Sequence, residues 1–140
     1  MNEELQYSYV TEAFQFLQDW ETRYQFIEDM GRKLPPMDEQ YKISEYQVHA
    51  CMSMVWIKAF KTEGSNIIYF QGDSDTSTIK GIVAILMSIY YQKTAAEILK
   101  IDADEKFSEL QLFDHLSPTR HVGVYAMVEH ARNQVKGLQC

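Results

Sequence analysis

One segment of the sequence, residues 78–91, constrains the possible folds more than any other. It is predicted to be a helix, and apolar residues occupy nearly every side of it. They are Ile79, Ile82, Val83, Ile85, Leu86, Met87 and Ile89. A helix that is apolar all round belongs in the middle of a fold, so the rest of the chain must cover it. Gly81 lies inside this segment, where it costs about 1 kcal/mol relative to alanine. We therefore expect Gly81 to permit a close crossing with the sheet or with another helix.

Three strands are predicted before this helix. Residues 46–50 and 55–60 show the period-two alternation of apolar and polar residues that is typical of strands. Residues 66–71 are rich in β-branched and aromatic residues and follow a turn at residues 62–65. Short connections between consecutive strands favour antiparallel neighbours, so we expect a three-stranded antiparallel meander.

Helices are predicted on both sides of these strands. Residues 11–30 carry one apolar stripe at helical spacing, as one helix or two short ones, and Gly31 followed by Leu34-Pro35-Pro36 is expected to end it. A capping box at residues 94–97 predicts a short helix, and Ser117 followed by Pro118 predicts the start of the last one. We expect a single α+β domain over residues 1–140, with the sheet packed by several helices.

Composition restricts the possible partners. Thirteen basic and twenty acidic residues give a net charge of −7, which argues against binding to nucleic acid and suggests a partner with a basic patch. The longest apolar run, residues 82–91, is too short to span a bilayer. The first five residues lack the features of a signal segment, and two cysteines do not make a disulfide framework. We therefore expect a cytoplasmic protein that needs no membrane.

Cys51 is the candidate reactive group. It falls between two predicted strands, where a thiol on a loop is held by a stiff scaffold and stays accessible to another protein. The structural alternative is that Cys51 is a small buried apolar side chain, as free cysteines often are. Cys140, the last residue, is expected to be incidental.

Arg120 is the second candidate, because it begins the apolar stripe of the last predicted helix. This position points it toward the interior or its edge, where an arginine needs an anionic or carbonyl partner. It either pairs with a carboxylate or the chain end, or approaches Cys51 and supports its thiolate. Asp73 and Asp75 likewise have two interpretations, as caps of the following helix or as part of a rim around the cysteine loop.

Four motifs in order along the chain resemble the SufE family of cysteine desulfuration proteins. The first is the helical segment from Trp20 to Pro35, and the second is the cysteine loop from Val48 to Trp56. The third is Gly72-Asp73-Ser74-Asp75 ahead of Lys80-Gly81. The fourth is His115-Leu116-Ser117-Pro118-Thr119-Arg120, followed by Gly123 and Ala126-Met127-Val128.

The resemblance implies a SufE/NifU-like fold and a sulfur acceptor. Members of the family take persulfide sulfur from a pyridoxal-phosphate cysteine desulfurase, stimulate that enzyme, and pass the sulfur on for iron–sulfur cluster assembly. Cys51 would form the persulfide and Arg120 would support it, with no metal or cofactor required. The surrounding loop and rim would consist of His49, Ala50, Ser53, Trp56, Asp73, Asp75 and His115.

Three residues depart from the family pattern. The family usually has glycine where Ala50 stands, so the loop is strained here if that residue needs a positive φ. It usually has glycine in place of Gln111 and asparagine in place of Val122. Gln111 affects the helix end before His115, and Val122 removes a polar side chain near the site.

The sequence leaves two other classes of function open. A thiol hydrolase or transferase would pair Cys51 with His49, His115 or His121, which requires contact in space. A zinc or cluster scaffold would need three or four ligands with cysteine prominent, and only Cys51 and Cys140 are available.

Overall fold

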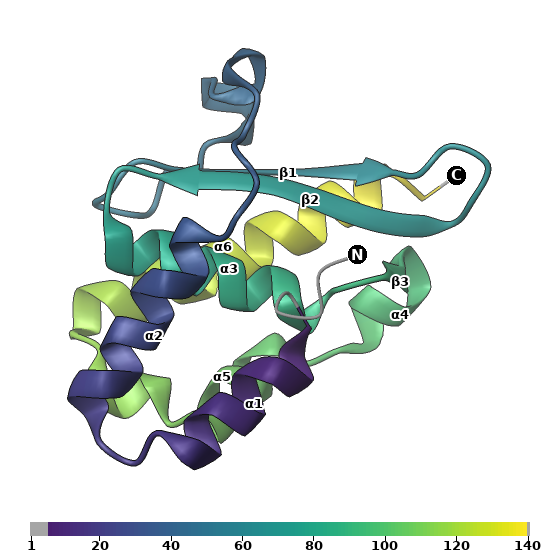
Figure 1. Ribbon diagram of the computed structural model, residues 1–140. Coiled ribbons are helices and arrows are strands. Elements are labelled where there is room, and N and C mark those ends of the chain that lie inside the picture. The colour runs from purple at the N-terminus through teal and green to yellow at the C-terminus, as the bar shows by residue number, and fades with distance from the viewer. Residues whose placement is uncertain (1–5, 140) are drawn as a thin grey trace.

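The computed structural model describes residues 6–139. Its elements are, in order, α1 (Tyr7–Phe16), α2 (Trp20–Arg32), η2 (Glu39–Tyr41), η3 (Ser44–Tyr46), β1 (Val55–Lys61), β2 (Ile67–Ser74), α3 (Ser77–Ile89), β3 (Lys93–Thr94), α4 (Ala95–Lys100), α5 (Ala103–Glu109), η4 (Leu112–His115) and α6 (Pro118–Gly137). The helices lie on one side of the β1–β2 pair, and the segment with η2 and η3 stands on the other side (Figure 1).

The sheet is three-stranded and antiparallel, as the sequence predicts, in the order β1-β2-β3. β1 and β2 form a hairpin whose register runs from Val55 opposite Ser74 to Lys61 opposite Ile68. Two of the three strands are therefore those expected, at residues 55–60 and 66–71. The third strand differs: it is the two-residue β3, which pairs with Ile67 and Ile68 after the chain has passed through α3.

The predicted strand at residues 46–50 is wrong. Residues 44–46 form the 3₁₀ helix η3, and only one isolated bridge, between Gln47 and Trp56, connects this segment to β1. The backbone N–H of Cys51 then donates to the carbonyl of Val48 at 3.3 Å, which turns the chain away from the sheet. A strand here would pair with the free edge of β1. Further along β1, that edge forms hydrogen bonds with side chains of α6 instead.

The apolar helix α3 lies at the centre of the core, as its composition predicts. Every residue from Gly81 to Leu86 is buried, and the strand residues Val55, Ile57 and Ala59 are buried on the helix side of the sheet. Helices α1 and α2 cover α3 from below in Figure 1, and α6 runs beside it under the sheet. Over residues 6–139, no helix is both long and apolar enough to cross a membrane.

The close crossing expected at Gly81 is confirmed, and its partner is α2. A Cβ atom added to Gly81 would lie 2.1 Å from the carbonyl oxygen of Ile27. A Cβ atom added to Gly31 would lie 2.8 Å from the backbone nitrogen of Gly81. Helix α2 ends at Arg32, within the stop predicted over residues 31–36, so Gly31 itself is still helical. It forms the other half of the crossing, where the two backbones touch.

The remaining helix predictions are largely confirmed. The apolar stripe of residues 11–30 belongs to two helices, and Asp19 caps the second by accepting from the backbone N–H of Thr22. The capping box formed by Thr94 and Glu97 is present at the start of α4. Ser117 caps α6 by accepting from the backbone N–H of Arg120 at 3.3 Å.

Helix α6 is fixed along the free edge of β1 by two side chains. His130 Nε2 donates to the carbonyl of Ile57 at 2.8 Å, and the backbone N–H of Ala59 donates to Gln134 Oε1 at 3.3 Å. These bonds satisfy backbone groups that an edge strand otherwise leaves open. Because they anchor α6 along β1, its N-terminal turns lie beside the loop that precedes β1, where Cys51 is found.

Candidate functional site

Cys51 lies in a loop, residues 48–54, that is closed at its base and attached to β1. The base is formed by the bridge between Gln47 and Trp56 and by the hydrogen bond from Val48 N–H to the Val55 carbonyl, at 2.8 Å. The loop itself contains no helix or strand. Cys51 therefore stands on an irregular segment whose two ends are held by a strand, a place that suits a functional side chain.

The thiol of Cys51 is half-buried and faces α6. Its Sγ–H donates to the carbonyl of Gly123 at 3.5 Å. A Cβ atom at position 123 would come within 3.3 Å of Sγ, so glycine leaves the space that the thiol occupies. Burial raises the pKa of the Cys51 thiol above its ordinary value, because the charged thiolate is poorly solvated there. In this conformation Cys51 is a protonated, weakly nucleophilic thiol.

Cys51 borders a cleft of about 340 Å³ between its loop, α3 and α6. The loop contributes residues 51–53, α3 contributes Ile79, and the first turns of α6 contribute Ser117, Thr119, Arg120, Gly123 and Met127. The floor of the cleft is partly apolar, through Ile79 and Met127, which are both buried. The two residues that the sequence singles out, Cys51 and Arg120, thus line the same cleft.

Arg120 differs from the expectation in one respect. The sequence predicts that its side chain points toward the interior or its edge and has an anionic or carbonyl partner, whereas the side chain is exposed and lines the edge of the cleft. The buried stripe of α6 begins only at Gly123 and Val124, so the first turn of the helix projects beyond the core. Within residues 6–139 the guanidinium has no hydrogen bond or ion pair, and the chain end considered as a partner lies outside the described residues. An unpaired cation therefore stands at the mouth of the cleft.

Asp75 and Thr76 hold the far end of the cysteine loop. The backbone N–H of Met54 donates to Asp75 Oδ1 at 3.1 Å, and the backbone N–H of Asp75 donates to the Met54 carbonyl at 3.2 Å. The hydroxyl groups of Ser53 and Thr76 share a hydrogen bond of 2.8 Å. Asp75 and Ser53 therefore anchor the loop to the end of β2, and Asp75 does not cap α3.

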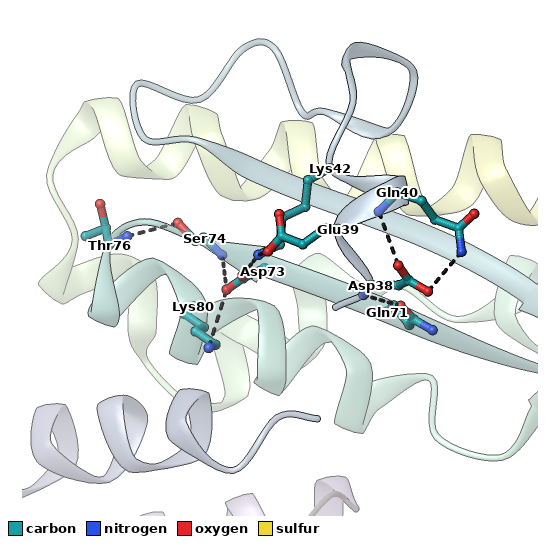
Figure 2. A network of polar contacts seen from close by, with 9 residues as sticks. All are labelled: Asp38, Glu39, Gln40, Lys42, Gln71, Asp73, Ser74, Thr76 and Lys80. Carbon is teal, nitrogen blue, oxygen red and sulfur yellow. Dashed lines mark hydrogen bonds and ion pairs between the residues drawn. The ribbon is translucent and has the colours of Figure 1, made fainter. Parts of the chain in front are cut away.

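Asp73 is the centre of a charged network beside this anchor (Figure 2). Lys42 Nζ lies 2.7 Å from Asp73 Oδ2, and Lys80 Nζ lies 3.4 Å from Oδ1. Partial burial acts to raise the pKa of Asp73, but the hydrogen bonds from Lys42 and from the backbone N–H of Ser74, together with the charge of Lys80, outweigh it, so this pKa lies below its ordinary value. Lys42 also pairs with Glu39 at 2.9 Å. Asp73 thus joins the η2 segment, β2 and α3, and it is a strand residue and not a helix cap.

The histidines named from the sequence do not contact Cys51. His49 Nε2 bonds to the carbonyl of Ser44 at 2.8 Å, and His121 bonds to the carbonyl of Phe113. His115 stacks on Trp20 with ring centroids 3.7 Å apart, and its carbonyl accepts from the hydroxyl of Tyr24. None of these rings lines the cleft. The contact that a Cys–His nucleophile requires is therefore missing from this conformation.

Trp56 and Ala50 also lie outside the cleft. Trp56 is on the outer face of the sheet, with the Lys42 ammonium 5.9 Å from its ring. Ala50 is exposed and its φ is not positive, so the strain considered for this residue does not arise. Within residues 6–139, no group of three histidine, cysteine, aspartate or glutamate side chains is placed to hold a metal ion.

Sequence reasoning missed several residues that line the cleft. Gly123 follows Arg120 by three positions, so helical spacing alone would have placed it on the same face as Arg120 and Met127. Thr119 and Met52 carried no such signal, because the direction of a side chain at a helix start or in a loop is not set by periodicity.

Comparison with known proteins decides the family. A model of the SufE family, described as an Fe-S metabolism associated domain, matches residues 8–135. The chain belongs to the SufE family. It is 35% identical to an uncharacterized SufE-like protein of Rhizobium meliloti, over 91% of this chain and 93% of that protein. It is 38% identical to another uncharacterized SufE-like protein, of Rhizobium etli, over 91% and 87% of the two chains. Membership of the SufE family supports a general role as a sulfur acceptor.

The SufE-family chain also shares its fold with a solved structure. The solution structure of a hypothetical protein from Thermus thermophilus matches with a TM-score of 0.75, over 98% of this chain and 97% of the other. The two sequences are 19% identical, so this likeness concerns the fold alone.

Two of the SufE motifs, the one that begins at Trp20 and the one that begins at His115, meet in the structure. The stacking of His115 on Trp20 joins the start of α2 to the segment that leads into α6.

Residue Gln111, where the family usually has glycine, has a φ of 58°, in the left-handed region that favours glycine. Val122, the third departure, is exposed on α6 and does not line the cleft.

Proposed function

We propose that Cys51 takes a sulfur atom from the persulfide of a pyridoxal-phosphate cysteine desulfurase and passes it on for iron–sulfur cluster assembly. The observation that carries this proposal is the position of Cys51, in the cleft of a SufE-family chain and on a loop that is held mainly at its ends. A thiol placed in this way can be sheltered at rest and delivered to a partner.

The proposed reaction is a thiol exchange without net oxidation. The Cys51 thiolate attacks the terminal sulfur of the desulfurase persulfide, and a new S–S bond forms at Cys51. The S–S bond on the desulfurase breaks, and its cysteine leaves as a thiolate that takes up the proton released by Cys51. The oxidation level of the transferred sulfur is kept, so no metal, external reductant or oxidant takes part.

Arg120 is proposed to support the anionic forms of Cys51. Its guanidinium is unpaired within residues 6–139 and lines the same cleft, so it is free to interact with a thiolate or persulfide. A nearby positive charge lowers the pKa of a thiol and opposes the effect of burial.

Docking on the desulfurase is proposed to open the loop. At rest, the Sγ of Cys51 is half-buried against Gly123, so transfer requires the thiol to turn outward. The change is local, because the anchors at Asp75 and Thr76 can remain in place while residues 50–52 move. The net charge of −7 favours a desulfurase surface with a basic patch, and we expect both proteins to work in the reducing cytoplasm.

The proposal is tested by the rate at which a desulfurase forms alanine from cysteine. Added wild-type chain should raise that rate, and the Cys51→Ser variant should not. Cys140→Ser is the matched control, because it removes the other cysteine and should stimulate as the wild type does. Arg120→Gln should stimulate less than Arg120→Lys, which keeps the positive charge. Full stimulation by Cys51→Ser would rule out the proposed role of the thiol.

A further inference from the structure

Met52, the residue after Cys51, is 87% exposed, which is unusual for a large apolar side chain. The two neighbours have different surroundings: the thiol faces α6, and the methionine side chain is in solvent. Met52 nevertheless borders the same cleft. The apolar side chain of Met52 is thus in water, beside a cleft with a partly apolar floor that the Cys51 thiol occupies.

The tip of the loop is weakly held. Cys51 is restrained there by two long hydrogen bonds, from its N–H to the Val48 carbonyl at 3.3 Å and from Sγ to the Gly123 carbonyl at 3.5 Å. Met52 makes no hydrogen bond through its backbone within residues 6–139. The strong anchors begin only at Ser53 and Met54. A rotation of residues 51 and 52 therefore breaks only these two long hydrogen bonds, while the rest of the loop stays in place.

We propose that Met52 exchanges places with Cys51 when the thiol turns outward. In the outward state the Met52 side chain enters the cleft and packs against Ile79 and Met127, in the space beside Gly123 that Sγ has left. The cleft, at about 340 Å³, is large enough for this side chain. Burial of the methionine stabilises the outward state, because apolar surface leaves the water. Its unbranched thioether chain adapts to an irregular space.

Met52 is therefore a positioning residue that acts through Cys51. The inward state shelters the thiol, and the outward state offers it for reaction while Met52 fills the vacated space. The functional use of this exchange rests on the proposed sulfur transfer, but the exchange itself needs no partner. It can be measured on the isolated chain, so its failure is distinguishable from failure of the sulfur-acceptor role.

The first test is the rate at which iodoacetamide, a small neutral reagent, alkylates Cys51 in the Cys140→Ser background. The rate reports the population of the outward state when opening is fast relative to alkylation. Met52→Gln keeps the length of the side chain but makes burial unfavourable, and should slow alkylation by about tenfold. Met52→Leu should restore the rate.

Met54→Gln is the matched control, because Met54 lies in the same loop but does not line the cleft. Cys51 in this variant should be alkylated at the wild-type rate. Thermal melts should be the same for Met52→Gln and wild type, since a side chain that is 87% exposed contributes little to the inward state. A pH profile of alkylation should show the same thiol pKa in both, which would exclude an electrostatic effect.

The second test places Met52 directly. In protein with ¹³C-labelled methionine methyl groups and a bulky disulfide adduct on Cys51, the Met52 methyl should show NOE contacts to Ile79 and Met127. The free thiol form should show them weakly or not at all. Equal alkylation rates in Met52→Gln and wild type, or a Met52 methyl that stays in solvent in the adduct, would overturn the proposal. An effect of Met52→Gln on the desulfurase reaction alone would assign Met52 to partner contact and would also overturn it.

Discussion

At the scale of single residues, the behaviour of Cys51 depends on the missing side chain of Gly123. The carbonyl of Gly123 accepts from Sγ, and Sγ is the atom that a Cβ at this position would meet. The thiol is thus sheltered by the backbone of α6 and not by a catalytic partner. This arrangement suits a carrier, which must keep its thiol unreactive until a partner is present.

Gly123→Ala is predicted to loosen this shelter. The added methyl group would lie 3.3 Å from Sγ, so the thiol must move outward by a few tenths of an ångström. Greater solvation should shift the thiol pKa back toward its ordinary value and raise the rate of alkylation by about twofold at neutral pH. Alanine within α6 should also raise the free energy of unfolding by up to about 1 kcal/mol.

Gly137→Ala serves as the control for this prediction. A Cβ atom at position 137, the last residue of α6, meets nothing within 4 Å. This variant should leave the alkylation rate of Cys51 unchanged. If both variants change the rate equally, the contact between Gly123 and the thiol is not what shelters it.

At the scale of elements, the crossing of α2 and α3 determines how closely the helical layers pack. Gly81→Ala should destabilise the protein by about 3 kcal/mol or more, because its Cβ atom would overlap the Ile27 carbonyl at 2.1 Å, and backbone moves less easily than a side chain. Helix propensity alone predicts the opposite sign, a gain of about 1 kcal/mol. Urea unfolding decides between them, and a stabilised Gly81→Ala variant would contradict the packing described.

The elements that the sequence predicts well are those whose signals are local. The caps at Ser117 and Thr94, the apolar surface of α3 and the hairpin of β1 and β2 all depend on neighbouring residues. The strand β3 has two residues and no pattern of its own, and it exists because β2 has a free edge there. The strand predicted at residues 46–50 is wrong for the opposite reason. Its residues alternate between apolar and polar, but only one bridge joins them to the sheet.

The same distinction applies to the site. The sequence places Cys51 in an irregular segment before β1 and Arg120 at the start of a helix, and both placements depend on local patterns. The direction of the Arg120 side chain cannot be read from the sequence, because it depends on how far α6 projects beyond the core. His115 shares a motif with Arg120 but stacks on Trp20, a contact between residues far apart in the chain that no local pattern shows.

At the scale of the whole molecule, stability should depend on pH through His130. Burial lowers the pKa of this histidine, the hydrogen bond to the Ile57 carbonyl partly opposes that effect, and the charge of His49 adds to it. The folded state therefore binds a proton less readily than the unfolded chain, whose histidine pKa is about 6.5. Stability is fully present above that pH and is lost as the pH falls toward the lowered folded pKa, by about 1.4 kcal/mol for each unit of difference.

Urea unfolding between about pH 7.5 and pH 5 measures this loss. His130→Gln keeps a donor for the Ile57 carbonyl but does not titrate, so its stability should fall less over that range. A variant with the same pH dependence as the wild type would show that other groups carry the effect.

The proposed role of the molecule depends above all on the transfer of one sulfur atom to Cys51. The most direct measurement is mass spectrometry of the chain and its peptides after incubation with a cysteine desulfurase and cysteine. We predict one added sulfur atom on the peptide that contains Cys51, and none on the Cys51→Ser variant. Sulfur found only on Cys140, or in equal amount on Cys51→Ser, would contradict this role.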